Sequence, residues 1–177
     1  MKNRFTQLGA LLGVALLTFA ACTKKETAPA PESAPAAQAP AAETAPAPVD
    51  ANAKPDLEIT IGTDGDQMAF DKKEFEVKAG SIVKVTFKNN AKAGGLQHNL
   101  MLVKPGTETE VANAAVAAGN DQGWIPQGNP NMLVTTKLVD PQQSDAVMFR
   151  APAAGDYPYI CTFPGHAMVM KGVMHSK

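Results

Sequence analysis

The chain has 177 residues and a formal net charge of −1, from 16 basic and 17 acidic side chains. No dense group of Lys and Arg is present to hold a phosphate backbone, so the sequence argues against nucleic acid as a partner. With only two cysteines and three histidines, it also lacks the thiolates that most structural zinc sites require.

The first 21 residues are typical of a secretory signal peptide. Lys2 and Arg4 precede an uncharged run over residues 8–21, which as a helix would span only about 21 Å of a hydrocarbon core of roughly 30 Å. The segment 19–22, FAAC, resembles the lipobox of bacterial lipoproteins, in which the cysteine is lipidated. We therefore predict a signal peptide over 1–21 and lipidation at Cys22. Ordinary cleavage that leaves Cys22 as a free thiol is the alternative.

Residues 22–54 are predicted to form a disordered linker that begins at the lipidated cysteine. Sixteen of the 21 residues from 28 to 48 are Ala or Pro and none is aromatic, so this segment has too little apolar surface to offset the entropy of folding. The remaining residues, 55–177, have the size of one domain with its own core. We expect an exported protein whose lipid anchor holds this domain at a bacterial membrane, facing the periplasm or the cell exterior.

Residues 55–177 contain a series of short strand patterns. Apolar and polar residues alternate over 57–61, and the same period of two follows in 75–77 and 83–87. Further strands, separated by turns rich in Gly, Pro and Asn, are predicted over 98–103, 137–139, 146–149, 157–161 and 172–175. This series predicts an all-β fold, a Greek-key β-sandwich.

One helix is predicted to interrupt the strands. The segment 107–110, TETE, is a capping-box pattern, and Gly119 closes the Ala-rich stretch that follows it. Because its apolar side chains are small, we predict a short helical insertion that lies against the sandwich. A long loop over 122–131 is expected to follow.

The segment 161–172, CTFPGHAMVMKG, brings a thiol, an imidazole and thioethers onto one short loop. Two histidines and one cysteine in a trigonal set, with a distant axial methionine, form the ligand field of blue-copper electron-transfer sites. The loop supplies Cys161, His166 and Met170. His98 is the candidate for the second histidine.

These motifs resemble the cupredoxins, and within them the azurin and auracyanin types. The Cys-x4-His-x3-Met spacing followed by Lys-Gly is similar to the azurin copper loop, and the tripeptide 97–99, QHN, resembles the family's other ligand strand. The resemblance implies one type 1 copper ion that cycles between Cu(II) and Cu(I). It implies His98, Cys161 and His166 as equatorial ligands and Met170 as the weak axial thioether.

The resemblance also implies which groups surround the ligands. The backbone N–H groups of Asn99 and Phe163 are expected to point at the thiolate, and the Asn99 side chain is expected to tie its strand to the loop near Thr162. Two features depart from azurins. Gln97 stands where azurins have Gly, so no approach of its carbonyl to the metal is predicted, and the azurin disulfide is absent, which favours the auracyanin type.

A docking surface and a function follow from the same resemblance. The edge of the His166 ring is expected to reach the surface within an apolar patch. The predicted patch residues are Leu96, Pro164, Ala167 and Met168. The resemblance implies a protein that is not an enzyme and that shuttles single electrons between membrane-associated redox partners.

Other interpretations of these residues stay open at this point. A copper delivery or sequestration module would use the same ligands, and a thiol enzyme would use Cys161 as nucleophile and His166 as base. Met168 is the alternative axial ligand. His175, on the last predicted strand, is expected not to be a ligand. Trp124 is expected to pack in the core or in a loop, with a partner contact as the alternative.

Overall fold

The computed structural model describes residues 49–50, 53–92 and 94–177. Within them the strands are β1 (Leu57–Gly62), β2 (Glu74–Val77), β3 (Ile82–Lys88), β4 (Met101–Val103), β5 (Met132–Thr135), β6 (Ser144–Arg150), β7 (Gly155–Ile160) and β8 (Lys171–Ser176), and the helices are α1 (Glu108–Ala118) and the 3-10 turn η1 (Asn120–Gln122). The predicted signal peptide 1–21, Cys22 and almost all of the predicted linker 22–54 lie outside the described residues. None of the described helices has the length and apolar character needed to cross a membrane.

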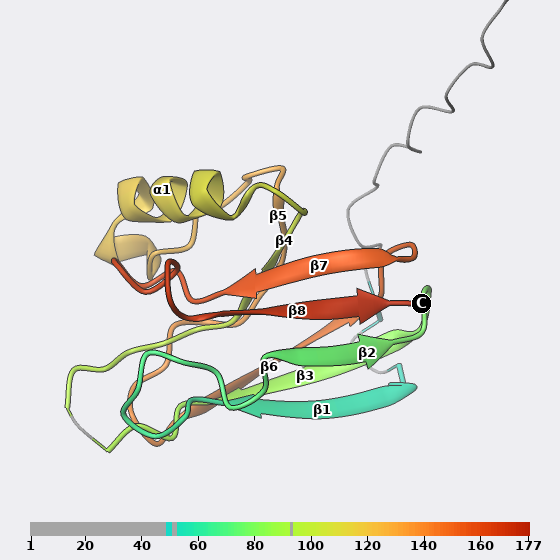
Figure 1. Ribbon diagram of the computed structural model, residues 1–177, viewed down its shortest axis with the longest axis horizontal. Coiled ribbons are helices and arrows are strands. Elements are labelled where there is room, and N and C mark those ends of the chain that lie inside the picture. Colours follow the sequence, from blue (N-terminus) through green and yellow to red (C-terminus); the bar gives the residue numbers. More distant parts are fainter. Residues whose placement is uncertain (1–48, 51–52, 93) are drawn as a thin grey trace, which may run out of the picture. The chain divides into compact units, whose positions relative to one another are not determined.

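The strands form two sheets that face each other as a sandwich (Figure 1). One sheet has the order β1-β3-β6 and the other the order β2-β8-β7-β4-β5. The β1–β3 and β2–β8 pairs are parallel, and the other pairs are antiparallel. The predicted all-β sandwich with one short helix is therefore confirmed.

Alternation along the strands fills the space between the sheets. In β3 the side chains of Val83, Val85 and Phe87 are buried while their neighbours are not, as the period of two in the sequence predicts. The same core contains Tyr159 and Met174 from the facing sheet, and it extends to Cys161 and Met170 at one end. Two side chains of the predicted ligand loop are thus part of the main core.

Helix α1 packs on the outside of the sandwich and differs from the predicted start. Val111 and Ala115 are its buried residues, and Val111 belongs to a second apolar cluster that includes Ile160 of β7. The predicted capping box is wrong, because the Thr107 hydroxyl donates to the carbonyl of Lys104 at 2.8 Å and makes no bond to the helix. The two glutamates of the first turn still favour this helix end, where the dipole is positive.

Two strand predictions need correction. Residues 98–100 do not belong to β4, because the Leu100 N–H donates to the Thr136 hydroxyl at 3.0 Å instead of to a backbone ladder. The predicted strand 137–139 is only an isolated bridge between Val139 and His98. Strand β5 was not predicted: its four residues show no alternation, and it pairs only with β4 at the edge of the sheet.

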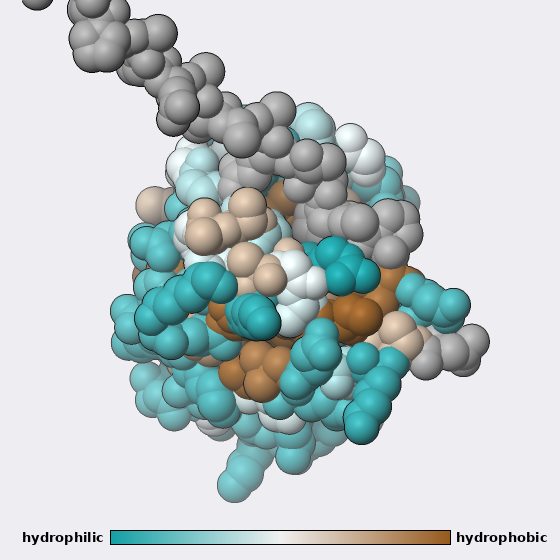
Figure 2. Space-filling view, turned by 90° about the vertical axis from the view of Figure 1, so that its right-hand side faces the viewer, coloured by the Kyte–Doolittle hydropathy of each residue, from teal (hydrophilic) through white to brown (hydrophobic). Residues whose placement is uncertain are grey.

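The two ends of the sandwich carry different features. Strand β7 ends and β8 begins at the left of Figure 1, where the loop 161–170 joins them. The other end carries the C-terminus, and Figure 2 shows it as a mostly hydrophilic face with a small apolar area. An open hollow of about 860 Å³ lies there, lined by Leu57, Val77 and Lys177 among others. This hollow is remote from every predicted ligand.

Candidate metal centre

Three buried side chains converge at the end of the sandwich where the loop 161–170 lies. The Nδ1 atoms of His98 and His166 lie 3.7 and 3.6 Å from the Sγ atom of Cys161, and 3.2 Å from each other. The point equidistant from these three atoms is about 2.0 Å from each, close to the roughly 2.0–2.3 Å of transition metal bonds to nitrogen and sulfur. The triangle has the size and donor atoms of a trigonal metal site.

Local backbone structure places each of these side chains. The His98 N–H donates to the Val139 carbonyl, and the Val139 N–H donates to the His98 carbonyl. These two hydrogen bonds fix His98 just before β4. Cys161 follows directly after β7, and its N–H donates to the carbonyl of Met170 at 3.1 Å. Within the loop from Cys161 to Met170, the His166 N–H donates a hydrogen bond to the Phe163 carbonyl. The Met170 N–H donates to the His166 carbonyl. The donor atoms therefore sit on a short, internally bonded loop and on a residue held by a neighbouring segment.

The two candidate thioethers lie in opposite environments. Met170 is fully buried in the same core cluster as Cys161, whereas the Met168 side chain is 71% exposed. An axial ligand must lie inside the site. The exposed position of Met168 argues against this role and leaves Met170 as the candidate.

Burial keeps the donor groups neutral when no metal is bound. Loss of hydration lowers the pKa of His98 to about 4, and the nearby His166 adds a smaller effect in the same direction. Burial also lowers the pKa of His166 and raises the pKa of the Cys161 thiol to about 11. The imidazoles are thus in the form that binds metals, while the thiol must release a proton when a metal binds.

The groups around the thiol match those that the resemblance implied. The N–H groups of Asn99 and Phe163 hydrogen-bond to Cys161 and partly offset the rise of its pKa. The Asn99 side chain makes two bonds to Thr162, one from its amide to the hydroxyl and one from the Thr162 N–H to its carbonyl oxygen, both 2.8 Å long. The Gln97 amide points elsewhere and donates to Asp140 at 2.7 Å. These bonds tie the two ligand segments together.

The residues of the predicted docking patch flank the ligands in the chain and differ in exposure. Leu96, Pro164 and Ala167 are half-buried, and Met168 is largely exposed. Sequence reasoning missed Val169, which is 58% exposed, and the side of α1 that faces the loop. There Val116, Phe163 and Met168 line a hollow of about 260 Å³. The run of apolar residues 167–170 is the sequence signal that could have identified Val169.

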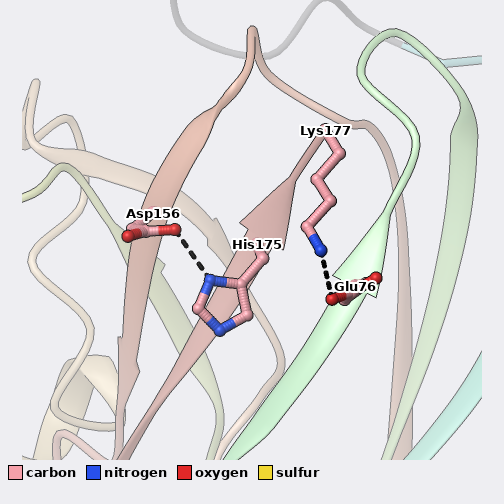
Figure 3. Close-up of polar contacts among 4 residues, drawn as sticks. All are labelled: Glu76, Asp156, His175 and Lys177. Carbon is pink, nitrogen blue, oxygen red and sulfur yellow. Dashed lines mark hydrogen bonds and ion pairs between the residues drawn. The ribbon is translucent and has the colours of Figure 1, made fainter.

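The remaining two singled-out residues lie in different places. His175 is outside the site, on β8, where its Nδ1 lies 2.7 Å from the Asp156 carboxylate, next to the Lys177–Glu76 ion pair (Figure 3). Trp124 is half-buried in the loop after α1, and its ring packs 6.2 Å from that of Phe163. The prediction of loop packing for Trp124 is therefore confirmed.

A β-sandwich that carries a buried triangle of two imidazoles and one thiol beside a buried methionine defines a mononuclear, cupredoxin-type metal protein. The model of the copper-binding proteins of the plastocyanin/azurin family matches residues 57–176. The chain belongs to this family, and within it to the azurin/auracyanin type. One type 1 copper ion fits the donor set, and membership of this blue-copper family implies electron transfer.

Relatives support the same assignment. The chain is 42% identical to auracyanin-A of Chloroflexus aurantiacus over 118 residues, which are 66% of this chain and 72% of that protein. It is 36% identical to the azurin of Bordetella pertussis over 115 residues, 62% of this chain and 77% of that protein. The match to auracyanin-B of Chloroflexus aurantiacus, 36% identical over 70% of this chain, spans 53% of that relative's length.

Solved structures agree in fold. The structure of auracyanin A, described as a "blue" copper protein from Chloroflexus aurantiacus, superposes with a TM-score of 0.65 at 40% identity, covering 68% of this chain and 98% of that one. A dithionite-reduced auracyanin from Roseiflexus castenholzii gives 0.64 at 40% identity, covering 68% and 96%.

Proposed function

We propose that this protein is a single-electron carrier whose copper ion is held by His98, Cys161 and His166, with Met170 as the weak axial ligand. The observation that carries the proposal is the triangle of two Nδ1 atoms and one Sγ atom with sides of 3.2, 3.6 and 3.7 Å. When bound, copper supplies a one-electron couple between Cu(II) and Cu(I).

The side chains around the copper set its reduction potential and the speed of electron exchange. Two neutral imidazoles suit both oxidation states, the thiolate offers a covalent path for the electron, and a soft thioether favours Cu(I) and so raises the potential. The paired bonds between Asn99 and Thr162 hold the strand and the loop in one arrangement. A site that does not rearrange between oxidation states exchanges electrons quickly.

The partners in this proposal are redox proteins that dock beside His166. The exposed Met168 and the half-buried Leu96, Pro164 and Ala167 would supply apolar surface for this contact. Such a surface suits a small, transient interface, typically below about 1,200 Å² in total. The protein itself catalyses no substrate turnover in this account.

The proposed location is a bacterial membrane, with the domain facing the periplasm or the cell exterior. The signal-like residues 1–21, the lipobox-like segment 19–22 and the Ala- and Pro-rich linker support a domain tethered through a lipidated Cys22. In this arrangement the partners are membrane-associated. Mass spectrometry of the protein from its native membrane tests the lipid on Cys22.

The two other functions considered for these residues predict different chemistry. A thiol enzyme needs an ionisable, accessible nucleophile, whereas Cys161 is fully buried and its pKa is raised to about 11. A copper delivery module would share the ligands but would release the metal readily. Only the electron carrier requires a reversible couple.

A redox titration of the copper-loaded protein, followed by visible absorption, tests the proposed function. We expect an intense thiolate-to-copper band that bleaches with reductant, returns with oxidant and follows a one-electron curve. In Cys161→Ser the band should be absent. If wild-type protein binds one copper without a reversible couple, the delivery module is the better account, and if Cys161→Ser stays blue, the ligand assignment is wrong.

A further inference from the structure

Three aromatic rings form a continuous row from the helical insertion to the metal centre. The Trp124 ring meets that of Phe163 edge-on, with centroids 6.2 Å apart and an interplanar angle of 71°. The Phe163 ring in turn lies against that of His166, with centroids 4.7 Å apart and an angle of 43°. The His166 ring also lies 4.8 Å from that of His98, at an angle of 35°. The His166 imidazole therefore contacts two rings, one of which is backed by Trp124.

The backbone of Trp124 has an unusual conformation. Its φ is 55°, in the left-handed region that bulky residues rarely adopt, and its N–H donates to the Gly119 carbonyl at 3.0 Å. The preceding Gly123 has a φ of 60°, so two consecutive residues turn the chain sharply after η1. Such conformations persist where the surrounding structure fixes them, and they cluster at functional sites.

The position of the indole ring of Trp124 is also unfavourable for hydrogen bonding. Its Nε1 atom is buried and has no hydrogen-bond partner among the described residues. A buried donor without a partner is unfavourable and calls for an explanation. The positive φ of Trp124 and its unpaired Nε1 atom are both unfavourable, and the contact of the ring with Phe163 is a favourable one that helps to offset them.

We propose that Trp124 is a positioning residue of the metal centre, which acts through Phe163 to hold the His166 imidazole at the angle at which Nδ1 faces Cys161 Sγ. The proposal rests on the proposed function, because it takes His166 as a metal ligand. This role of Trp124 also gives a function to the helical insertion, which consists of α1 and the turn that follows it. Helix α1 is fixed to the sandwich through Val111 and Ala115, and the turn after it delivers Trp124 to the loop 161–170.

The chain offers matched variants for a test. Trp124→Leu keeps an apolar side chain but removes the ring edge, Trp124→Phe restores an aromatic edge, and Gln122→Ala changes an exposed residue on the same insertion. Two measurements separate positioning from simple stabilisation. The first is the nuclear Overhauser contact between the rings of residues 163 and 166 in the full-length, metal-free protein, and the second is the rate of copper release to a chelator.

For Trp124→Leu we expect loss or broadening of the ring contact and copper release faster by about tenfold or more, as for other residues that orient metal ligands. Trp124→Phe and Gln122→Ala should stay close to wild type. A purely structural role predicts instead that Trp124→Leu lowers the melting temperature but changes neither measurement, and that result would overturn the proposal. The ring contact needs no metal, so it tests Trp124 even if the wild-type protein shows no blue copper band.

The same residue provides an independent check. Trp124 is the single tryptophan of the chain, so all indole fluorescence reports on this position. Because the ring is one aromatic contact away from His166, Cu(II) should quench this fluorescence with a one-to-one endpoint. A titration in which stoichiometric copper binding leaves the emission unchanged contradicts the coupling between Trp124 and the site.

Discussion

The Nδ1 atoms of His98 and His166 lie 3.2 Å apart, although 68 positions separate the two residues in the chain. At this distance two neutral imidazoles either share a proton or have a cation between them, because two lone pairs alone repel. The Cys161 Sγ atom lies at nearly equal distances from both nitrogens. The fold thus brings three donors to bonding range of one point, and metal binding requires no rearrangement of the ligand segments.

Replacement of the axial candidate should change the potential more than the colour. In Met170→Gln a hard amide oxygen takes the place of the soft thioether, which favours Cu(II). We expect the blue band to remain and the reduction potential to fall by at least about 60 mV, which is a tenfold change for one electron. Protein-film voltammetry measures the reduction potential. Met168→Gln is the matched control, and an equal shift in both variants would remove Met170 from the axial position.

Loss of the Asn99 side chain should weaken the fold near the site. Asn99→Ala removes two hydrogen bonds of 2.8 Å and leaves both the buried Thr162 N–H and its hydroxyl without these partners. A cost of about 1–3 kcal/mol in the free energy of unfolding is expected for unsatisfied buried groups. Denaturant unfolding of the metal-free protein measures it. Gln97→Ala, which loses a more exposed bond to Asp140, should cost less, and a reversed order would contradict the role given to Asn99.

A methyl group at Gly172 should be poorly tolerated. Its Cβ would collide with the Tyr159 ring and lie 2.7 Å from the Lys73 carbonyl oxygen. Overpacking of this kind destabilises by about 1–3 kcal/mol. Thermal unfolding of Gly172→Ala tests this, with Gly94→Ala as control because a Cβ there meets no atom within 4 Å. Equal melting temperatures in the two variants would show that the Tyr159 ring is free to move.

The stability of the metal-free protein should fall on the acid side of neutrality. Burial lowers the pKa of His98 from 6.5 to about 4 and that of His166 in the same direction, so between pH 6.5 and 4 the unfolded chain binds protons that the folded chain does not. Unfolding is then favoured as the pH falls. For His98 alone the loss is on the order of 3 kcal/mol at roughly 1.4 kcal/mol per pKa unit. Denaturant unfolding at a series of pH values measures it.

The loss of stability at alkaline pH has a separate cause. The pKa of Cys161 is raised from 9.0 to about 11, so above pH 9 the unfolded thiol ionises before the folded one and stability falls as the pH rises. Cys161→Ser should move the onset of this loss toward pH 10, where Tyr159, whose pKa burial also raises, begins to act. The acid side should be unchanged in this variant. A flat profile between pH 4 and 11 would contradict both assignments.

Local patterns made much of the site predictable. The Cys-x4-His-x3-Met spacing lies within ten residues, so the sequence itself displays the three groups that one loop brings together. The period of two in β3 likewise reports which of its side chains are buried. The contact between Asn99 and Thr162 spans 63 positions and was accessible only through the family resemblance.

Features that depend on tertiary context were missed. Thr107 begins a capping-box sequence, but its hydroxyl donates to the Lys104 carbonyl and the cap does not form. The short edge strand β5 shows no alternation because Val134 packs in the main core while Met132 packs against the second apolar cluster. The row from Trp124 through Phe163 to His166 depends on a left-handed backbone turn that no pattern in the sequence indicates.

X-ray absorption at the copper edge of the loaded protein tests the central claim most directly, because it counts the atoms bound to the metal. We predict two nitrogen neighbours near about 2.0 Å and one sulfur near about 2.2–2.3 Å. Cys161→Ser should remove the sulfur contribution and leave the nitrogens. A copper ion bound by nitrogen and oxygen alone in the wild-type protein would contradict the assignment of His98, Cys161 and His166 as its ligands.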